Sequence, residues 1–72
     1  MTKKERETMN ITLWKLANRY IRAENNGKNE EYLNGYYFSM VTVFSTLNTD
    51  IDLTDLLVKI KDGMTYNEIF NK

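Results

Sequence analysis

The chain has 72 residues, with ten basic and ten acidic side chains and no Cys or His. A chain of this length is expected to form one domain and to bury only about 60% of its unfolded surface, so its own core gives marginal stability. The composition excludes disulfides and a Cys/His zinc site, and it lacks the usual catalytic base and thiol nucleophile. We therefore expect a protein that is not an enzyme, uses no cofactor and associates with other chains.

The charges are unevenly distributed. Residues 1–28 contain seven Lys or Arg against three Glu, a net charge of +4, and residues 29–72 contain three Lys against seven Asp or Glu, a net charge of −4. Two halves of opposite net charge favour antiparallel packing within the chain or between copies. No apolar run follows the opening MTKKERET, so we expect no signal peptide, and the lack of Cys favours a cytoplasmic location.

The first predicted helix begins at Thr8 or earlier, after a charged start expected to fray in part, and runs over about residues 8–24. Its apolar residues recur at spacings of three, four and seven, which is typical of an amphipathic helix. These residues are Met9, Leu13, Leu16, Ala17, Tyr20 and Ile21, with Trp14 at the edge. The segment Asn25-Asn26-Gly27 is expected to end the helix, because Asn and Gly tolerate the left-handed conformation.

The uncharged stretch 32–49 organises the chain. It predicts a second helix over residues 29–48, capped by Asn29, antiparallel to the first and packed on most of its sides. Large residues form one line along this helix and small ones an opposite line: Tyr32, Tyr36, Met40, Val43 and Leu47, against Gly35, Ser39, Thr42 and Thr46. The stretch is too polar and too short for a membrane span, so we expect no membrane association.

Two short helices are predicted to follow, over residues 52–62 and 65–71. Asp52 caps the first of them and Gly63 ends it. Thr65 and Glu68 have the spacing of a capping box, which marks the start of the last helix. The expected fold class is all-α: a small helical bundle in which a long antiparallel helical hairpin is closed by two short C-terminal helices.

The segment 56–69 resembles the first half of a helix-turn-helix of the LuxR type, with a leucine pair, a glycine, a polar residue and then Glu-Ile opening the next helix. In that family a recognition helix follows and reads the major groove. The sequence here ends at Lys72, so we interpret the likeness as shared helix capping. Nearby, Asp50, Asp52 and Asp55 lack the central Gly and distal Glu of a calcium loop, and we expect no metal site.

Aromatic residues are the feature that indicates a function. The chain has one Trp, five Tyr and three Phe, more than a small bundle covers, and exposed aromatics anchor protein interfaces. The predicted interface residues are Trp14, Tyr37, Phe38, Ile11 and Phe44. We expect a non-catalytic protein-binding module, a small regulator, adaptor or inhibitor of a larger protein, that also self-associates. Small Asn- and Lys-rich chains of this kind are typical of phage or mobile-element proteins that block a host enzyme.

The sequence leaves other functions open. Lys15, Arg19 and Arg22 form a basic face on the first helix, which fits a dimeric nucleic-acid-binding regulator that contacts phosphates. A purely structural assembly subunit is the third interpretation. The aromatic surplus fits a homodimer and a complex with a different protein equally well.

Overall fold

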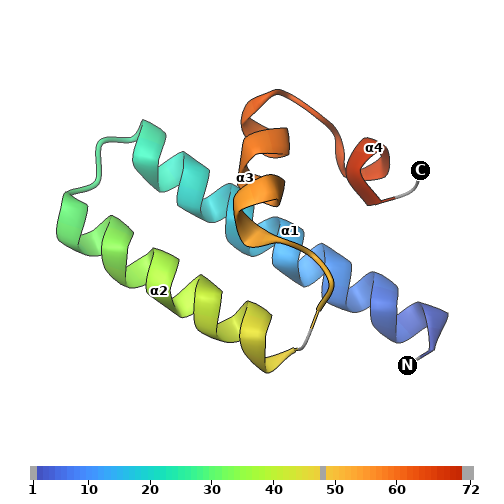
Figure 1. Ribbon diagram of the computed structural model, residues 1–72. Helices are drawn as coiled ribbons and strands as arrows, with labels where there is room; N and C mark the ends of the chain where they lie inside the picture. Colours follow the sequence, from blue (N-terminus) through green and yellow to red (C-terminus); the bar gives the residue numbers. More distant parts are fainter. Residues whose placement is uncertain (1, 48, 71–72) are drawn as a thin grey trace.

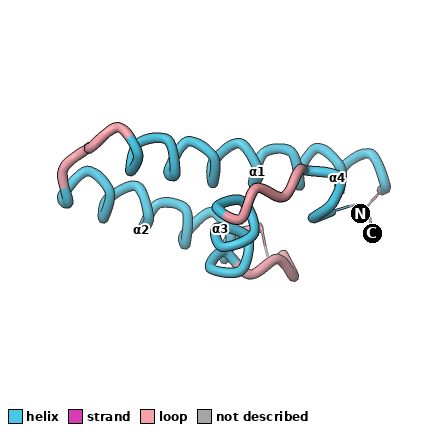
Figure 2. Tube along the Cα trace, turned by 90° about the horizontal axis from the view of Figure 1, so that it is seen from above, coloured by secondary structure: helices cyan, strands magenta, loops and turns pink. Residues whose placement is uncertain are grey.

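The computed structural model describes residues 2–47 and 49–70, and these residues form helices and no strand. The helices are α1 (Lys3–Asn25), α2 (Glu30–Thr46), α3 (Leu53–Lys61) and α4 (Tyr66–Phe70). α1 and α2 contact each other as an antiparallel hairpin, α3 crosses α1, and α4 lies beside α1 (Figure 1). Seen from above, α1 and α2 run side by side, and α3 is viewed along its axis (Figure 2). The predicted all-α fold class is confirmed.

α1 begins at Lys3, which agrees with the predicted start at Thr8 or earlier, and a capping box starts it. The Thr2 hydroxyl accepts from the Glu5 N–H at 3.1 Å, and the Glu5 carboxylate accepts from the Thr2 N–H at 3.3 Å. These two bonds satisfy backbone donors that the first helical turn leaves free. The charged residues expected to fray therefore extend the helix, and the Thr-x-x-Glu spacing was the sequence signal for it.

Glycines end α1 and α3, as predicted. Gly27 and Gly63 have φ angles of 76° and 86°, in the left-handed region where a Cβ is strained. At the end of α1, the N–H groups of Gly27 and Lys28 donate to the carbonyls of Glu24 and Ala23, both at 3.1 Å. The chain after α3 repeats this bonding pattern around Gly63. Both ends are Schellman motifs, which satisfy carbonyls that a helix leaves free.

The predicted caps at the other helix starts are confirmed. The Asn29 side chain accepts a backbone N–H of the first turn of α2 at 2.8 Å, and Asp52 does so for α3 at 3.0 Å. At α4, the Thr65 N–H donates to the Glu68 carboxylate at 2.9 Å, and the Glu68 N–H donates to the Thr65 hydroxyl at 3.3 Å. Each start is thus set by its own side chains.

Thr65→Ala is expected to destabilise the protein by about 1 kcal/mol, because the Glu68 N–H loses its acceptor at the helix start. Urea unfolding followed by circular dichroism measures this loss. A variant as stable as the parent that loses a binding partner would show that this turn is instead part of an interface.

The same variant has a titration signature. The Thr65 N–H, and then the Thr65 hydroxyl, bond the Glu68 carboxylate and hold the pKa of Glu68 below its usual value of 4.5. Because the folded pKa is lowered, the stabilising contribution is present above pH 4.5 and is lost as the pH falls through the folded value. In Thr65→Ala the hydroxyl bond is gone, so the pKa of Glu68 should rise toward 4.5 in an NMR titration. An unchanged pKa would contradict the role of the hydroxyl.

The core lies where α1, α2 and α3 meet. Its buried residues are Leu13, Ala17, Met40, Phe44, Leu53, Leu56 and Leu57. Ile51, next to the Asp52 cap, and the α4 residues Ile69 and Phe70 pack against this cluster. A hydrogen bond joins the two helices of the hairpin, because the Tyr36 hydroxyl on α2 donates to the Leu16 carbonyl on α1 at 3.0 Å. Burial raises the pKa of Tyr36.

α2 is packed on one side only, which corrects the expectation of a central helix covered on most sides. Among its described residues only Met40 and Phe44 are buried, while Tyr32 is 49% exposed. Gly35 belongs to the line of small residues. Apart from its sequence neighbours and the backbone of its own helix, no atom of the described residues lies within 4 Å of its Cβ position, so none of the described helices packs there. The reason is that α3 and α4 both lie toward α1 and leave α2 at an edge (Figure 1). None of the described helices is long and apolar enough to cross a membrane.

Candidate interaction surface on α2

One face of α2 carries large apolar side chains in contact with solvent. Spacings of three and four place five positions on one side of the helix. They are Asn34, Tyr37, Phe38, Val41 and Ser45, called here the outer stripe. Phe38 is 75% exposed, Val41 40% and Tyr37 36%, and the stripe contains no charged residue. Large exposed apolar residues gathered on one helix face are a feature of protein interaction sites.

Tyr37 is held in place from the α1 side. Its ring lies 5.9 Å from that of Tyr20, and the Tyr20 ring lies 6.0 Å from that of Tyr36. Tyr36 in turn contacts the ring of Tyr32 at 6.3 Å. Ring pairs at these separations are favourable, so this row of tyrosines fixes the border of the outer stripe. A fixed border lowers the entropy lost when a partner binds.

The five predicted interface residues do not form one surface. Tyr37 and Phe38 lie together on the outer stripe, and Ile11 is 42% exposed. Ile11, however, is two positions before the buried Leu13, which places it about 160° away on the solvent face of α1.

The expectation that Trp14 and Phe44 lie free for a partner is corrected by their packing. Phe44 is 7% exposed, because it follows the buried Met40 by four residues and shares its face. Trp14 is half-buried, since α4 brings Tyr66 edge-on against it at a ring distance of 5.8 Å. Sequence reasoning also missed Val41, although its spacing of three from Phe38 was a usable signal.

Two open hollows follow the junction of α1 and α2. One, of about 480 Å³, is lined by Lys4, Glu5, Thr8, Met9, Thr12 and Leu47. The other, of about 270 Å³, is lined by Leu16, Arg19, Tyr36, Ser39, Met40 and Val43. Both include charged side chains, which distinguishes this seam from the outer stripe.

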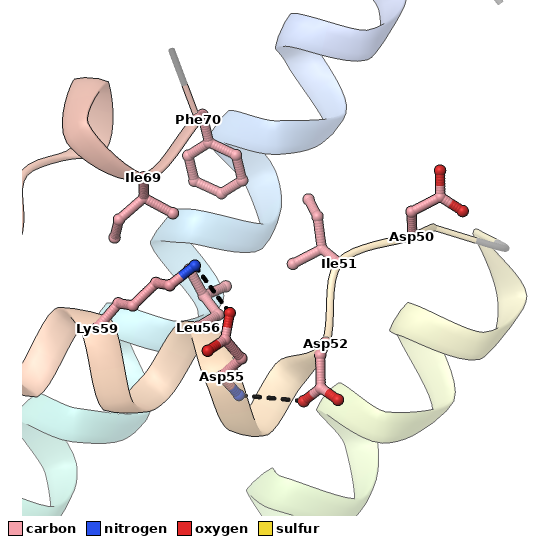
Figure 3. A pocket seen from close by; sticks show the side chains of 8 residues that line it. All are labelled: Asp50, Ile51, Asp52, Asp55, Leu56, Lys59, Ile69 and Phe70. Atoms are coloured by element: carbon pink, nitrogen blue, oxygen red, sulfur yellow. Dashed lines mark hydrogen bonds and ion pairs between the residues drawn. The ribbon is translucent and has the colours of Figure 1, made fainter. Parts of the chain in front are cut away.

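A third hollow, of about 240 Å³, lies at the start of α3 beside α4 (Figure 3). Asp52 there accepts the Asp55 N–H, and the Asp55 carboxylate pairs with Lys59 at 2.9 Å, while Asp50 points away from both (Figure 3). In the described ranges, no group of three His, Cys, Asp or Glu side chains is arranged to hold a metal ion. Asp52 and Asp55 therefore have structural roles in the first turns of α3.

The basic residues predicted on the first helix lie together. Lys15, Arg19 and Arg22 line an open hollow of about 400 Å³ with Trp14 and Asn18, and all three cations are exposed. The ion pairs found between described residues join Lys59 to Asp55 and Lys61 to Glu24, so none involves these three. This basic face on α1 is available to an anionic ligand.

No protein-family model, no curated protein and no solved structure matches the chain. The exposure, charge and packing of its own residues are therefore the observations that bear on function. The outer stripe is uncharged and exposes Tyr37, Phe38 and Val41, whereas the basic face is cationic.

Proposed function

We propose that the protein is a non-catalytic protein-binding module, a small regulator, adaptor or inhibitor of a larger protein, and that the outer stripe is its binding surface. The observation that carries this proposal is Phe38, an aromatic side chain that is 75% exposed on an uncharged helix face. Phe has no polar group to interact with water, and an aromatic ring buries about 150–250 Å² in a contact. Such residues are the anchors of protein interfaces.

Two further observations support the proposal. The outer stripe is mounted on a hairpin held by the core and by the Tyr36 bond to Leu16, so it is presented on a fixed scaffold. The sequence contains no His and no Cys, so the usual base and the thiol nucleophile are missing. We place the protein in the cytoplasm, because disulfides do not persist in that reducing compartment and a chain without Cys does not depend on them.

A dimeric nucleic-acid-binding regulator is the second candidate, favoured by the clustering of Lys15, Arg19 and Arg22 in one hollow. Each phosphate contact made by such cations releases counterions and makes affinity fall as salt rises. A purely structural assembly subunit, the third candidate, would bind copies of itself and no other protein.

A titration at two salt concentrations tests the proposal, with the parent and the Arg19→Ala/Arg22→Ala double variant. The partner is first isolated by a pull-down from the native host and identified by mass spectrometry. We expect affinity for it to change weakly with salt and little in the double variant, because charges at an interface rim mainly affect the association rate. A steep salt dependence that disappears in the double variant would overturn the outer stripe as the binding surface and place binding on the basic face of α1, which the nucleic-acid candidate uses.

A further inference from the structure

The accessible surface of the molecule is larger than that of a compact monomer of the same mass. Its accessible surface is 5333 Å² for a chain of 8.6 kDa, and its Cα extents are 38 × 26 × 16 Å. A compact monomer of this mass exposes about 4,700 Å², so the excess is roughly 600 Å². A stable protein complex buries about 800 Å² on each partner. The area that this flat chain leaves uncovered is therefore close to what one interface between two copies needs.

The residues of the outer stripe are placed almost symmetrically about a point near the middle of α2. Its midpoint lies between Ser39 and Met40, so Phe38 and Val41 are equally distant from it, as are Asn34 and Ser45. In a twofold dimer each residue meets its counterpart twice, once from each copy. If two α2 helices pack antiparallel about this midpoint, an apolar residue meets an apolar one and an amide meets a hydroxyl. The stripe is thus complementary to itself.

Charge selects the antiparallel orientation. Glu30 and Glu31 are exposed in the first turn of α2, and no residue from 32 to 49 is charged. Two parallel α2 helices would place four carboxylates side by side at one end, which is unfavourable. Antiparallel helices place Glu30 and Glu31 opposite the uncharged end of the other copy. This argument applies only to the outer stripe, because the seam of α1 and α2 carries both signs of charge.

We propose that a second copy of this chain covers the outer stripe, with the two α2 helices antiparallel and Phe38 of each copy packed on Val41 of the other. The proposal rests on the proposed function, since it concerns the same surface, and a larger protein would bind there in place of the second copy. In this dimer Asn34 of one copy lies opposite Ser45 of the other. The distance between the two Asn34 positions is then about 16 Å along the helices, at 1.5 Å per residue.

Cross-linking tests the orientation, because the chain has no Cys and each variant carries a single thiol. Asn34→Cys and Ser45→Cys are treated with a short bismaleimide, separately and as an equimolar mixture. We expect a cross-linked dimer in the mixture and none from either variant alone, since facing helices lie about 8–10 Å apart. Cross-linking of Asn34→Cys alone would show parallel helices and overturn the proposal, while leaving the outer stripe as a binding surface.

Sedimentation equilibrium tests whether a second copy of the chain covers the outer stripe. The parent is expected at twice the 8.6 kDa chain mass at micromolar concentration, Phe38→Glu at the chain mass, and the control Ile11→Glu at twice that mass. Both replaced residues are exposed, so circular dichroism should show all three proteins folded alike. A parent of 8.6 kDa, or a dimer lost in Ile11→Glu and kept in Phe38→Glu, overturns the proposal. A monomeric parent that binds its partner through Phe38 leaves the proposed function standing. A dimer that does not depend on Phe38 overturns the dimer proposed here and leaves the outer stripe free for the larger partner protein.

Discussion

Met40→Asp is expected to unfold the protein. Met40 is 1% exposed and belongs to the cluster that joins α1, α2 and α3, together with Leu13 and Leu56. An unpaired buried carboxylate costs several kcal/mol, which is about the whole stability of so small a domain. Circular dichroism should show loss of helix at room temperature. A variant that folds like the parent would mean that Met40 does not face the core.

Val43→Asp is the matched control for this prediction. Val43 lies one turn further along the same line of large residues, and that pattern alone predicts that both variants unfold. Both residues line the same open hollow beside Arg19, but the structure separates them by burial, because Met40 is 1% exposed and Val43 is only half-buried. A carboxylate at position 43 reaches water and a cation, so Val43→Asp should stay folded with a smaller loss of stability. Complete unfolding of both variants would show that this hollow is closed in solution.

The helix ends could be predicted from the sequence because each depends on a few adjacent residues. Asn29, Asp52 and Thr65 accept N–H groups within their own first turns, and Gly27 and Gly63 supply the left-handed conformation locally. The capping box at Thr2 also depends on adjacent residues, but no apolar periodicity marks residues 3–7, so the apolar pattern alone indicates a later helix start.

Burial was harder to predict because it depends on where distant segments lie. Trp14 is covered by Tyr66, more than fifty residues later in the chain, and α2 is left open because α3 and α4 lie toward α1. The exposure of Phe38 was predictable, since a helix that buries Met40 turns Phe38 about 160° away. That Phe38 binds a partner stays a prediction.

Phe38→Ala is expected to weaken binding to the protein partner by about 2 kcal/mol or more, roughly thirtyfold in Kd, as truncation of an interface anchor does. The parent and the variant should unfold at nearly the same denaturant concentration, because the ring is 75% exposed and contributes little to the chain's own core. Calorimetric titration of the identified partner measures the change in affinity. A loss of affinity without a loss of stability is the combination that a binding role predicts and a folding role does not.

The control for Phe38→Ala is Ile11→Ala, which removes an apolar side chain that is also exposed, at 42%, but on the solvent face of α1. If loss of any exposed apolar area weakened binding, both variants would bind more weakly, each in proportion to the area removed. If the outer stripe is the binding surface, Ile11→Ala should bind like the parent, because energy concentrates in a few central residues and falls to near zero outside the interface. A larger loss for Ile11→Ala than for Phe38→Ala would move the binding surface to α1, where the basic residues lie, and would overturn the outer stripe as the binding surface.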